Sequence, residues 1–205
     1  MELILVRHGE TFENITGICQ GHLNSQLTPT GIQQAREIAL FLKGKKIDYA
    51  FSSDLDRAKD TLMEILTFHK NISPILTKDL REQSKGIYEG KSNLKRNEDL
   101  DKLNIPYYIF KPEEGESLIE VWERVIPFLE KVMKEYKESC VLIVGHGGPL
   151  SCLLTYLHDK PIEFYKNYLP KKNTALSMVQ IEGNKKTFHK INCTEHLNLL
   201  NSTLN

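Results

Sequence analysis

Two histidines follow short apolar runs at places where they could carry out chemistry. Arg7-His8-Gly9 comes directly after the apolar residues 3–6, and Gly145-His146-Gly147 comes after the apolar residues 140–144. The packing of a buried strand does not require such residues at its end. A neutral imidazole can attack phosphorus or bind a metal ion. We therefore expect both histidines to belong to an active site.

An arginine and a glutamate are expected at the same edge of the protein. Arg57 lies in the first turn after a predicted strand at residues 47–51, and Glu82 follows a predicted strand at 74–76. In sheets of parallel strands, ligands bind beyond the carboxyl ends of the strands. Two arginines, two histidines and one carboxylate would meet there in a cationic pocket. The forked donors of arginine suit phosphate oxygens, so phosphate is the expected ligand.

These residue types suit phosphoryl transfer. One neutral histidine can attack phosphorus in line and form a phosphohistidine, which water then hydrolyses. The arginines and the second histidine can stabilise charge, and the carboxylate can protonate the leaving oxygen. Gly147 and Gly148, at the start of a predicted helix, can offer backbone N–H groups to the same anion.

Less specific interpretations apply to the same residues. Either histidine could be a satisfied core or surface residue, and Arg57 with Glu82 could be a solvated ion pair of little energetic value. His8, His146 and Glu82 could instead form a metal site with two histidines and one carboxylate. Two arginines in the same crevice would repel a divalent cation, so we expect no metal.

The elements that position these residues alternate between strands and helices. Apolar runs predict strands at 3–6, 47–51, 74–76 and 140–144, and apolar periodicity predicts helices at 28–42, 55–68, 117–132 and 150–157. Thr28-Pro29 and Ser117 have the residue types of helix starts, and Pro127 is expected to kink or break the third helix. Residues 174–181 and 186–191 predict an antiparallel hairpin. The pattern predicts an α/β fold, a three-layer sandwich with a mostly parallel central sheet and helices on both faces.

Three segments stand outside this alternation. Residues 9–26 are polar and glycine-containing, which predicts a long functional loop. Residues 91–115 are charged and then aromatic, and we interpret them as an insertion that covers the site. A loosely ordered tail is expected from about residue 194, at the end of a single domain that spans residues 1–205.

The composition excludes several classes of partner. Lysine plus arginine equals aspartate plus glutamate at 27 each, so no overall field favours nucleic acid or an anionic membrane, and neither partner is expected. The sequence shows no secretory leader and no apolar run of the ~20 residues that span a bilayer, which favours the cytoplasm. The four cysteines are scattered and are expected to be packing residues. A monomer or a homodimer is expected.

Several ordered motifs together resemble the histidine phosphatase (phosphoglycerate mutase-like) superfamily, and they cover most of the chain. They are Leu5-Val6-Arg7-His8-Gly9-Glu10-Thr11 with Asn14, Gln20-Gly21, Leu27-Thr28 with Gly31 and Gln34-Ala35, Ser52-Ser53-Asp54-Leu55 with Arg57-Ala58 and Thr61, Leu80-Arg81-Glu82 with Gly86 and Glu89-Gly90, Gly115-Glu116-Ser117, and Val144-Gly145-His146-Gly147-Gly148. Asn24-Ser25-Gln26 departs from the family pattern of an aspartate followed by a small residue or proline.

The resemblance implies a phosphoglycerate mutase-like fold and a role for each site residue. His8 would be the phosphorylated nucleophile, Arg7, Arg57 and His146 would bind the phosphoryl group, and Glu82 would be the proton donor. Asn14, Gln20 and Gly21 would line the phosphate or substrate pocket together with Gly147. No cofactor is implied.

Within the family, the covering insertion separates mutases from phosphatases. Residues 91–115 are short and contain Lys95-Arg96 but no pair of adjacent arginines, which in the mutases holds the substrate carboxylate. The resemblance therefore implies a cofactor-independent phosphomonoesterase that acts on a small phosphorylated metabolite, similar to the broad-specificity, alpha-ribazole phosphate and phosphoserine phosphatase branches. A phosphoglycerate mutase and a non-catalytic phospho-ligand-binding module are the alternatives. The loop residues that could select the leaving group are Ile15, Cys19, Tyr88, Tyr107 and Tyr108.

Overall fold

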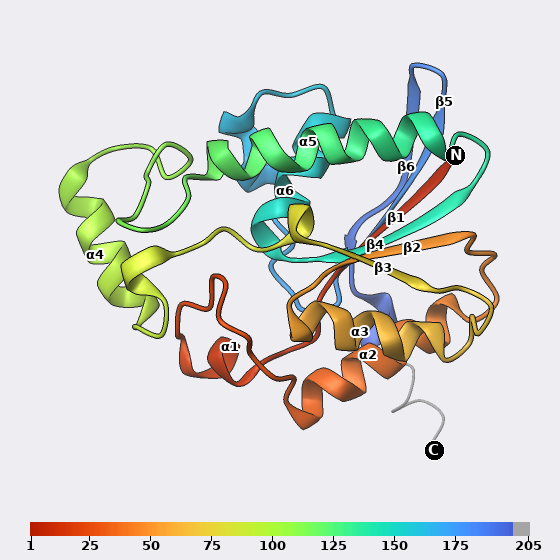
Figure 1. The fold of residues 1–205 in the computed structure, drawn as a ribbon, viewed down its shortest axis with the longest axis horizontal. Helices are drawn as coiled ribbons and strands as arrows, with labels where there is room; N and C mark the ends of the chain where they lie inside the picture. The colour runs from red at the N-terminus through yellow and green to blue at the C-terminus, as the bar shows by residue number, and fades with distance from the viewer. Residues whose placement is uncertain (199–205) are drawn as a thin grey trace.

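The computed structural model describes residues 1–198, in which helices surround a six-stranded sheet (Figure 1). The strands are β1 (Glu2–Arg7), β2 (Tyr49–Ser53), β3 (Pro74–Thr77), β4 (Cys140–Gly145), β5 (Leu176–Glu182) and β6 (Lys185–Cys193). The α-helices are α1 (Phe12–Thr16), α2 (Pro29–Leu42), α3 (Asp56–Leu66), α4 (Asn93–Leu103), α5 (Leu118–Glu135) and α6 (Gly147–Leu157). Short 3-10 helices are η1 (Lys78–Leu80), η2 (Gly86–Tyr88), η3 (Ile162–Tyr168) and η4 (Glu195–Asn198).

The sheet has the strand order β3-β2-β4-β1-β5-β6. The neighbours β3, β2, β4 and β1 are parallel, whereas β5 pairs antiparallel with both β1 and β6. The prediction of an α/β fold with a mostly parallel central sheet is therefore confirmed. Each predicted strand overlaps an observed one, and the predicted hairpin is β5 with β6.

Side chains of β1 alternate between two apolar cores, one on each face of the sheet. Leu3 and Leu5 pack in the core that α5 and α6 cover, and Ile4 and Val6 pack in the core that α2 and α3 cover. All four side chains are fully buried. This pattern is typical of a parallel strand with helices on both faces, and Figure 1 shows the two helical layers above and below the sheet.

The predicted helix starts have the expected caps. Thr28 Oγ1 accepts a hydrogen bond from Gly31 N at 2.9 Å, and Ser117 forms a reciprocal capping box with Glu120. The predicted break at Pro127 is not observed: α5 runs continuously from Leu118 to Glu135, and its apolar side is buried against the sheet. Packing of the flanking turns outweighs the local cost of the proline.

Two predicted irregular segments contain helices. The loop at residues 9–26 includes α1, and the insertion at 91–115 includes α4, which has no buried residue and therefore no apolar stripe that sequence periodicity could reveal. The expected loose tail from residue 194 is wrong at its start, because η4 occupies Glu195–Asn198. There, His196 is buried and its Nε2 lies 2.9 Å from Thr174 Oγ1. Residues 199–205 of that prediction lie outside the described residues.

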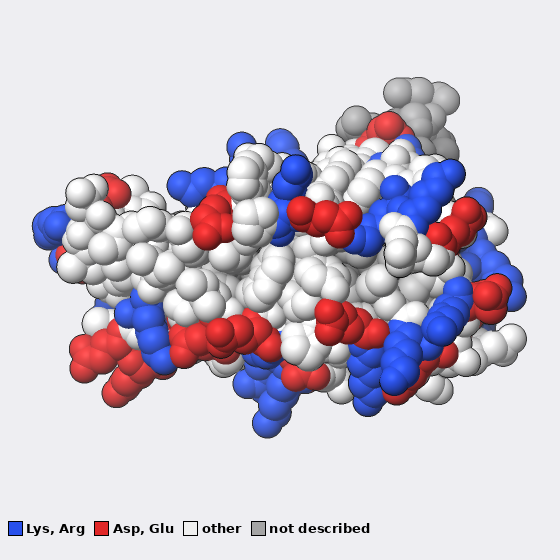
Figure 2. All heavy atoms as spheres, turned by 90° about the horizontal axis from the view of Figure 1, so that it is seen from above, with Lys and Arg blue, Asp and Glu red and all other residues white. Residues whose placement is uncertain are grey.

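Charged side chains of both signs are mixed on the face that α5 covers (Figure 2). This surface agrees with the balance of 27 basic and 27 acidic residues in the sequence. Within residues 1–198, none of the helices combines enough length with enough apolar character to cross a membrane.

Candidate active site

His8 and His146 lie side by side at the carboxyl ends of two adjacent strands. The parallel register of β1 and β4 pairs Arg7 with Gly145, so the next residue of each strand is a histidine. The centroids of the two imidazole rings are 5.2 Å apart, and both side chains are buried. The two histidines are therefore neighbours, as predicted, although only His8 is among the residues that line the cavity at this edge of the sheet.

Hydrogen bonds fix the protonation of His8. Its Nδ1 lies 2.7 Å from the carbonyl oxygen of Gly9, and since a carbonyl can only accept, Nδ1 carries the proton. The Nε2 atom then has the free lone pair. Burial, with the positive charges of Arg57 and Arg7, holds the pKa of His8 well below its usual value. The ring is therefore neutral at pH 7, as a nucleophile must be.

The backbone around His8 is anchored from distant parts of the chain. Gly9 N donates to Thr61 Oγ1 at 2.9 Å, and the His8 carbonyl accepts from Thr174 N at 3.2 Å and from Asn173 Nδ2 at 3.1 Å. A Cβ atom at Gly9 would lie only 2.5 Å from the Gly31 carbonyl oxygen, so this position admits only glycine without a backbone shift. The imidazole is thus held by α3, α2 and the segment before β5.

His146 has the opposite tautomer. Arg57 Nε donates to its Nδ1 at 3.2 Å, so the proton of the neutral ring is on Nε2. That Nε2 is buried and has no hydrogen-bond partner among the described residues. Burial and the charge of Arg57 hold the pKa of His146 well below its usual value. The ring therefore presents an unused N–H donor, which suits an anionic oxygen.

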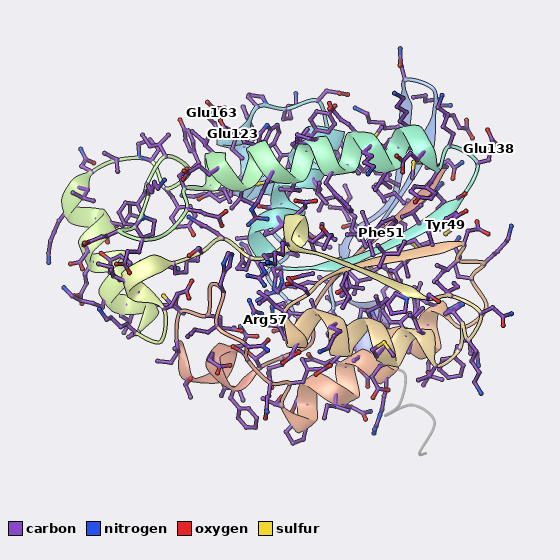
Figure 3. All side chains as sticks on the ribbon, viewed as in Figure 1. Tyr49, Phe51, Arg57, Glu123, Glu138 and Glu163 are labelled. Carbon is purple, nitrogen blue, oxygen red and sulfur yellow. The ribbon has the colours of Figure 1, made fainter. Side chains whose placement is uncertain are left out.

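Arg57 is a fully buried cation at the N-terminal end of α3 (Figure 3). Its Nη1 donates to the Leu23 carbonyl and its Nη2 to the Gly21 carbonyl, both at 2.8 Å. Burial lowers its pKa to about 10, so the guanidinium stays protonated at neutral pH. Arg57 therefore orients His146 and fastens the loop at residues 21–23 to the site.

Arg7 supplies a second guanidinium, on a half-buried side chain. Its Nη1 donates to the carbonyl oxygens of Pro170 and Lys171 at 2.9 and 2.8 Å, whereas its Nε is buried without a partner among the described residues. Burial lowers the pKa of Arg7 from its usual value. An anion in the pocket would supply the missing acceptor.

Glu82 reaches the N-terminus of α6. Its Oε1 accepts from Gln83 N at 2.9 Å and from Gly148 N at 3.2 Å, whereas the hydrogen bond that Oε2 accepts within residues 1–198 is a longer one, of 3.4 Å, from Gly148 N. The Glu82 carbonyl accepts from His22 Nε2 at 2.8 Å and from Arg124 Nη2 at 3.1 Å. The carboxylate is therefore held in place, with Oε2 the less occupied oxygen.

The remaining predicted site residues surround the same cavity, whose volume is about 640 Å³. Asn14 Oδ1 accepts from Thr11 N and Asn173 Nδ2, each at 3.1 Å, and Gln20 Oε1 is buried without a partner among residues 1–198. The predicted residues that line the cavity are Arg7, His8, Asn14, Gln20, Gly21, Arg57, Glu82 and Gly147. His146 lies beside His8, with its ring against that of the nucleophile.

The insertion at residues 91–115 lines the cavity through Asn93, Arg96 and Tyr107. Of the residues proposed to select the leaving group, Cys19 and Tyr107 line the cavity, whereas Ile15, Tyr88 and Tyr108 do not. Cys19 Sγ donates to Asn93 Oδ1 at 2.9 Å, and burial raises the pKa of its thiol. No group of three His, Cys, Asp or Glu side chains is placed to hold a metal ion in the described part of the chain.

Two important residues are not predicted from the sequence. Asn173 touches both the His8 carbonyl and Asn14, but only the pairing of β5 with β1 brings it there. Lys85, which lines the cavity, follows Glu82 by three residues in a charged segment that gives no signal of burial. The proximity of Lys85 to the Glu82 motif is the one signal that could have identified it.

Sequence comparison decides the family. Residues 3–194 match the histidine phosphatase superfamily (branch 1). The chain belongs to this superfamily. A relative from Hydrogenobacter thermophilus with the name "Putative phosphoserine phosphatase 2" is 36% identical over 195 residues, which cover 93% of this chain and 94% of the relative. The predicted family is confirmed.

Solved structures of two phosphatases resemble this histidine phosphatase over nearly its whole length. The alpha-ribazole phosphatase from Shigella flexneri is 28% identical with a TM-score of 0.85, and covers 95% of this chain and 97% of its own. The phosphoserine phosphatase from Entamoeba histolytica, in complex with 3-phosphoglyceric acid, is 27% identical with a TM-score of 0.82, and covers 96% and 98%. The relatives support the predicted phosphatase branch and the predicted fold.

Proposed function

We propose that this histidine phosphatase hydrolyses phosphomonoesters of small metabolites through a phosphohistidine on His8. The observation that carries the proposal is the tautomer of His8, which is neutral and holds its Nδ1 proton on Gly9, so that Nε2 has a free lone pair. Arg7 lines the same cavity as His8, and the His146 ring centroid is 5.2 Å from that of His8. Among residues 1–198, Arg7 Nε and His146 Nε2 are buried donors without a partner. These donors can bind the phosphoryl oxygens as charge develops on them.

The first step forms the bond between His8 Nε2 and phosphorus as the bond from phosphorus to the ester oxygen breaks. The leaving oxygen takes a proton from Glu82, which we place on Oε2 because amide donors occupy Oε1. Water then attacks the phosphorus and the bond to Nε2 breaks. The proton of that water returns to Glu82, and inorganic phosphate leaves.

We also propose that the chain acts as a single domain in the cytoplasm, without a metal or cofactor. The four cysteines are free in the structure, and three of them are buried, which suits a reducing compartment.

Hydrolysis of p-nitrophenyl phosphate by the purified protein tests the proposal. We expect phosphate release from the wild type and its loss in His8→Ala, because no other group replaces the nucleophile. Full turnover by His8→Ala would refute the mechanism. Interconversion of 2- and 3-phosphoglycerate that is faster than hydrolysis would instead favour the mutase, and tight phosphate binding with no turnover of any ester would favour the binding module.

A further inference from the structure

A buried lysine forms part of the cavity wall. Lys85 is only 8% exposed, and its Nζ donates to Gln83 Oε1 at 2.6 Å and to Tyr107 Oη at 2.7 Å. Tyr107 Oη in turn donates to Gln83 Oε1 at 2.8 Å. A lysine ammonium has three N–H donors, so one remains after these two bonds. Both neighbours are uncharged, and burial of a cation without a carboxylate is costly.

Other cations share this wall. The Arg96 Cζ lies 5.8 Å from the centre of the Tyr107 ring, and the guanidinium bonds to the uncharged Asn97 Oδ1. Lys166 and Lys171 also line the cavity. Within residues 1–198, no carboxylate oxygen lies within 4.0 Å, the limit for an ion pair, of the side-chain nitrogens of four cations: Lys85, Arg96, Lys166 and Lys171.

The charge of the cavity is therefore one-sided. Its lining includes six basic side chains, Arg7, Arg57, Lys85, Arg96, Lys166 and Lys171, and one acidic side chain, Glu82. The protein as a whole has 27 of each sign, so this excess is local. Glu82 already accepts backbone amides and does not neutralise the lysines.

The cations form two groups. Arg7 and Arg57 are the charges that lower the pKa of His8, whereas Lys85 and Arg96 lie near Cys19 and act on its thiol pKa. Arg96 and Tyr107 come from the insertion that contains α4, which Figure 1 shows beyond the strand ends. The negative charge of one phosphoryl group on His8 would balance the positive charges of Arg7 and Arg57. The second group is available to another part of the same ligand.

We propose that Lys85, with Arg96, determines specificity by binding an anionic substituent on the leaving group, either a carboxylate or a second phosphate. This inference rests on the proposed phosphatase function. The preferred substrates are then phosphomonoesters of acidic small metabolites, and esters of neutral alcohols are poorer substrates. Gln83 and Tyr107 position the ammonium, and they contribute no charge of their own.

The test compares substrates that differ only in the anion. 3-Phosphoglycerate and glycerol 3-phosphate differ by a carboxylate in place of an alcohol, and fructose 1,6-bisphosphate and fructose 6-phosphate differ by a phosphate. We expect the wild type to prefer the anionic member of one pair in kcat/KM by about tenfold or more, as a charge-assisted hydrogen bond provides. The pair that shows the preference identifies the anion.

Lys85→Met should abolish that preference by raising KM for the anionic ester, and it should lower kcat/KM for p-nitrophenyl phosphate by a much smaller factor. Lys85→Arg should retain much of the preference, and Lys91→Met, an exposed lysine outside the cavity, should retain all of it. Equal loss on all substrates, or no preference in the wild type, would overturn the inference. Absence of p-nitrophenyl phosphate hydrolysis in the wild type would instead refute the proposed function.

Discussion

Replacement of Glu82 by glutamine should slow the hydrolysis of alkyl phosphates far more than that of p-nitrophenyl phosphate. The new side-chain amide can keep the hydrogen bonds from Gln83 N and Gly148 N through its oxygen, so the fold should be unaffected. It cannot supply the proton that a poor leaving group needs. Nitrophenolate leaves without protonation, whereas an alkoxide does not.

The size of the loss follows from the role of the carboxyl group. A positioned general acid contributes about 10²–10⁴-fold to a rate, which corresponds to about 3–5 kcal/mol in the activation free energy. We expect the rate constant for the release of glycerol from glycerol 3-phosphate in the first step to fall by about that factor in Glu82→Gln, and the rate constant for the release of nitrophenolate from p-nitrophenyl phosphate to change much less. Single-turnover kinetics with each of the two esters measure these rate constants, and thermal unfolding of the variant is the control for folding. An equal decrease on the two substrates would refute the assignment of Glu82 as proton donor.

Other expectations follow from contacts around the same site. In Gly148→Ala the new Cβ would lie 2.4 Å from Glu82 Oε1, so the carboxylate should move and the rate of alkyl phosphate hydrolysis should fall. Gly44→Ala is the control: the new Cβ would meet no neighbouring atom within 4 Å, so the rate should not change. Arg57→Lys removes the Nε–H bond to His146 Nδ1 and should lower kcat by about 10²-fold or more, as loss of an oriented donor does. Burial lowers the pKa of both active-site histidines in the folded protein. As the pH falls below about 6.5, these two histidines therefore take up protons in the unfolded chain but stay neutral in the folded chain. The free energy of unfolding should therefore decrease by about 1 kcal/mol for each histidine between pH 7.5 and 5.5 in urea titrations, and a stability that rises as the pH is lowered over this range would contradict the burial of neutral rings.

The position of the reactive pair could be predicted because it depends on short segments. The runs at residues 3–8 and 140–146 each contain a buried strand and its histidine, and adjacent parallel strands end at the same edge of the sheet. Arg57 lies in the first turn of α3, soon after β2, and Glu82 follows β3 after the short helix η1. In these cases the element and its functional residue are neighbours in the sequence.

The remaining parts of the site depend on contacts between distant segments. Asn173 reaches His8 across 165 residues, and the pairing that brings it there is a property of the whole sheet. α4 has no buried residue, so its periodicity gives no signal, and His196 is buried because Thr174 and Phe41 of α2 lie beside it. Lys85 illustrates the same limit, because its two hydrogen-bond partners come from the neighbouring Gln83 and from the distant Tyr107.

The most direct test of the central claim is a rapid acid-free quench of the enzyme with a ³²P-labelled phosphomonoester. We predict a covalently labelled protein that is stable in base and labile in acid, as a phosphohistidine is, with the label on the peptide that contains His8. The label should be absent in His8→Ala. Label on another residue, or turnover with no labelled protein under single-turnover conditions, would contradict the account.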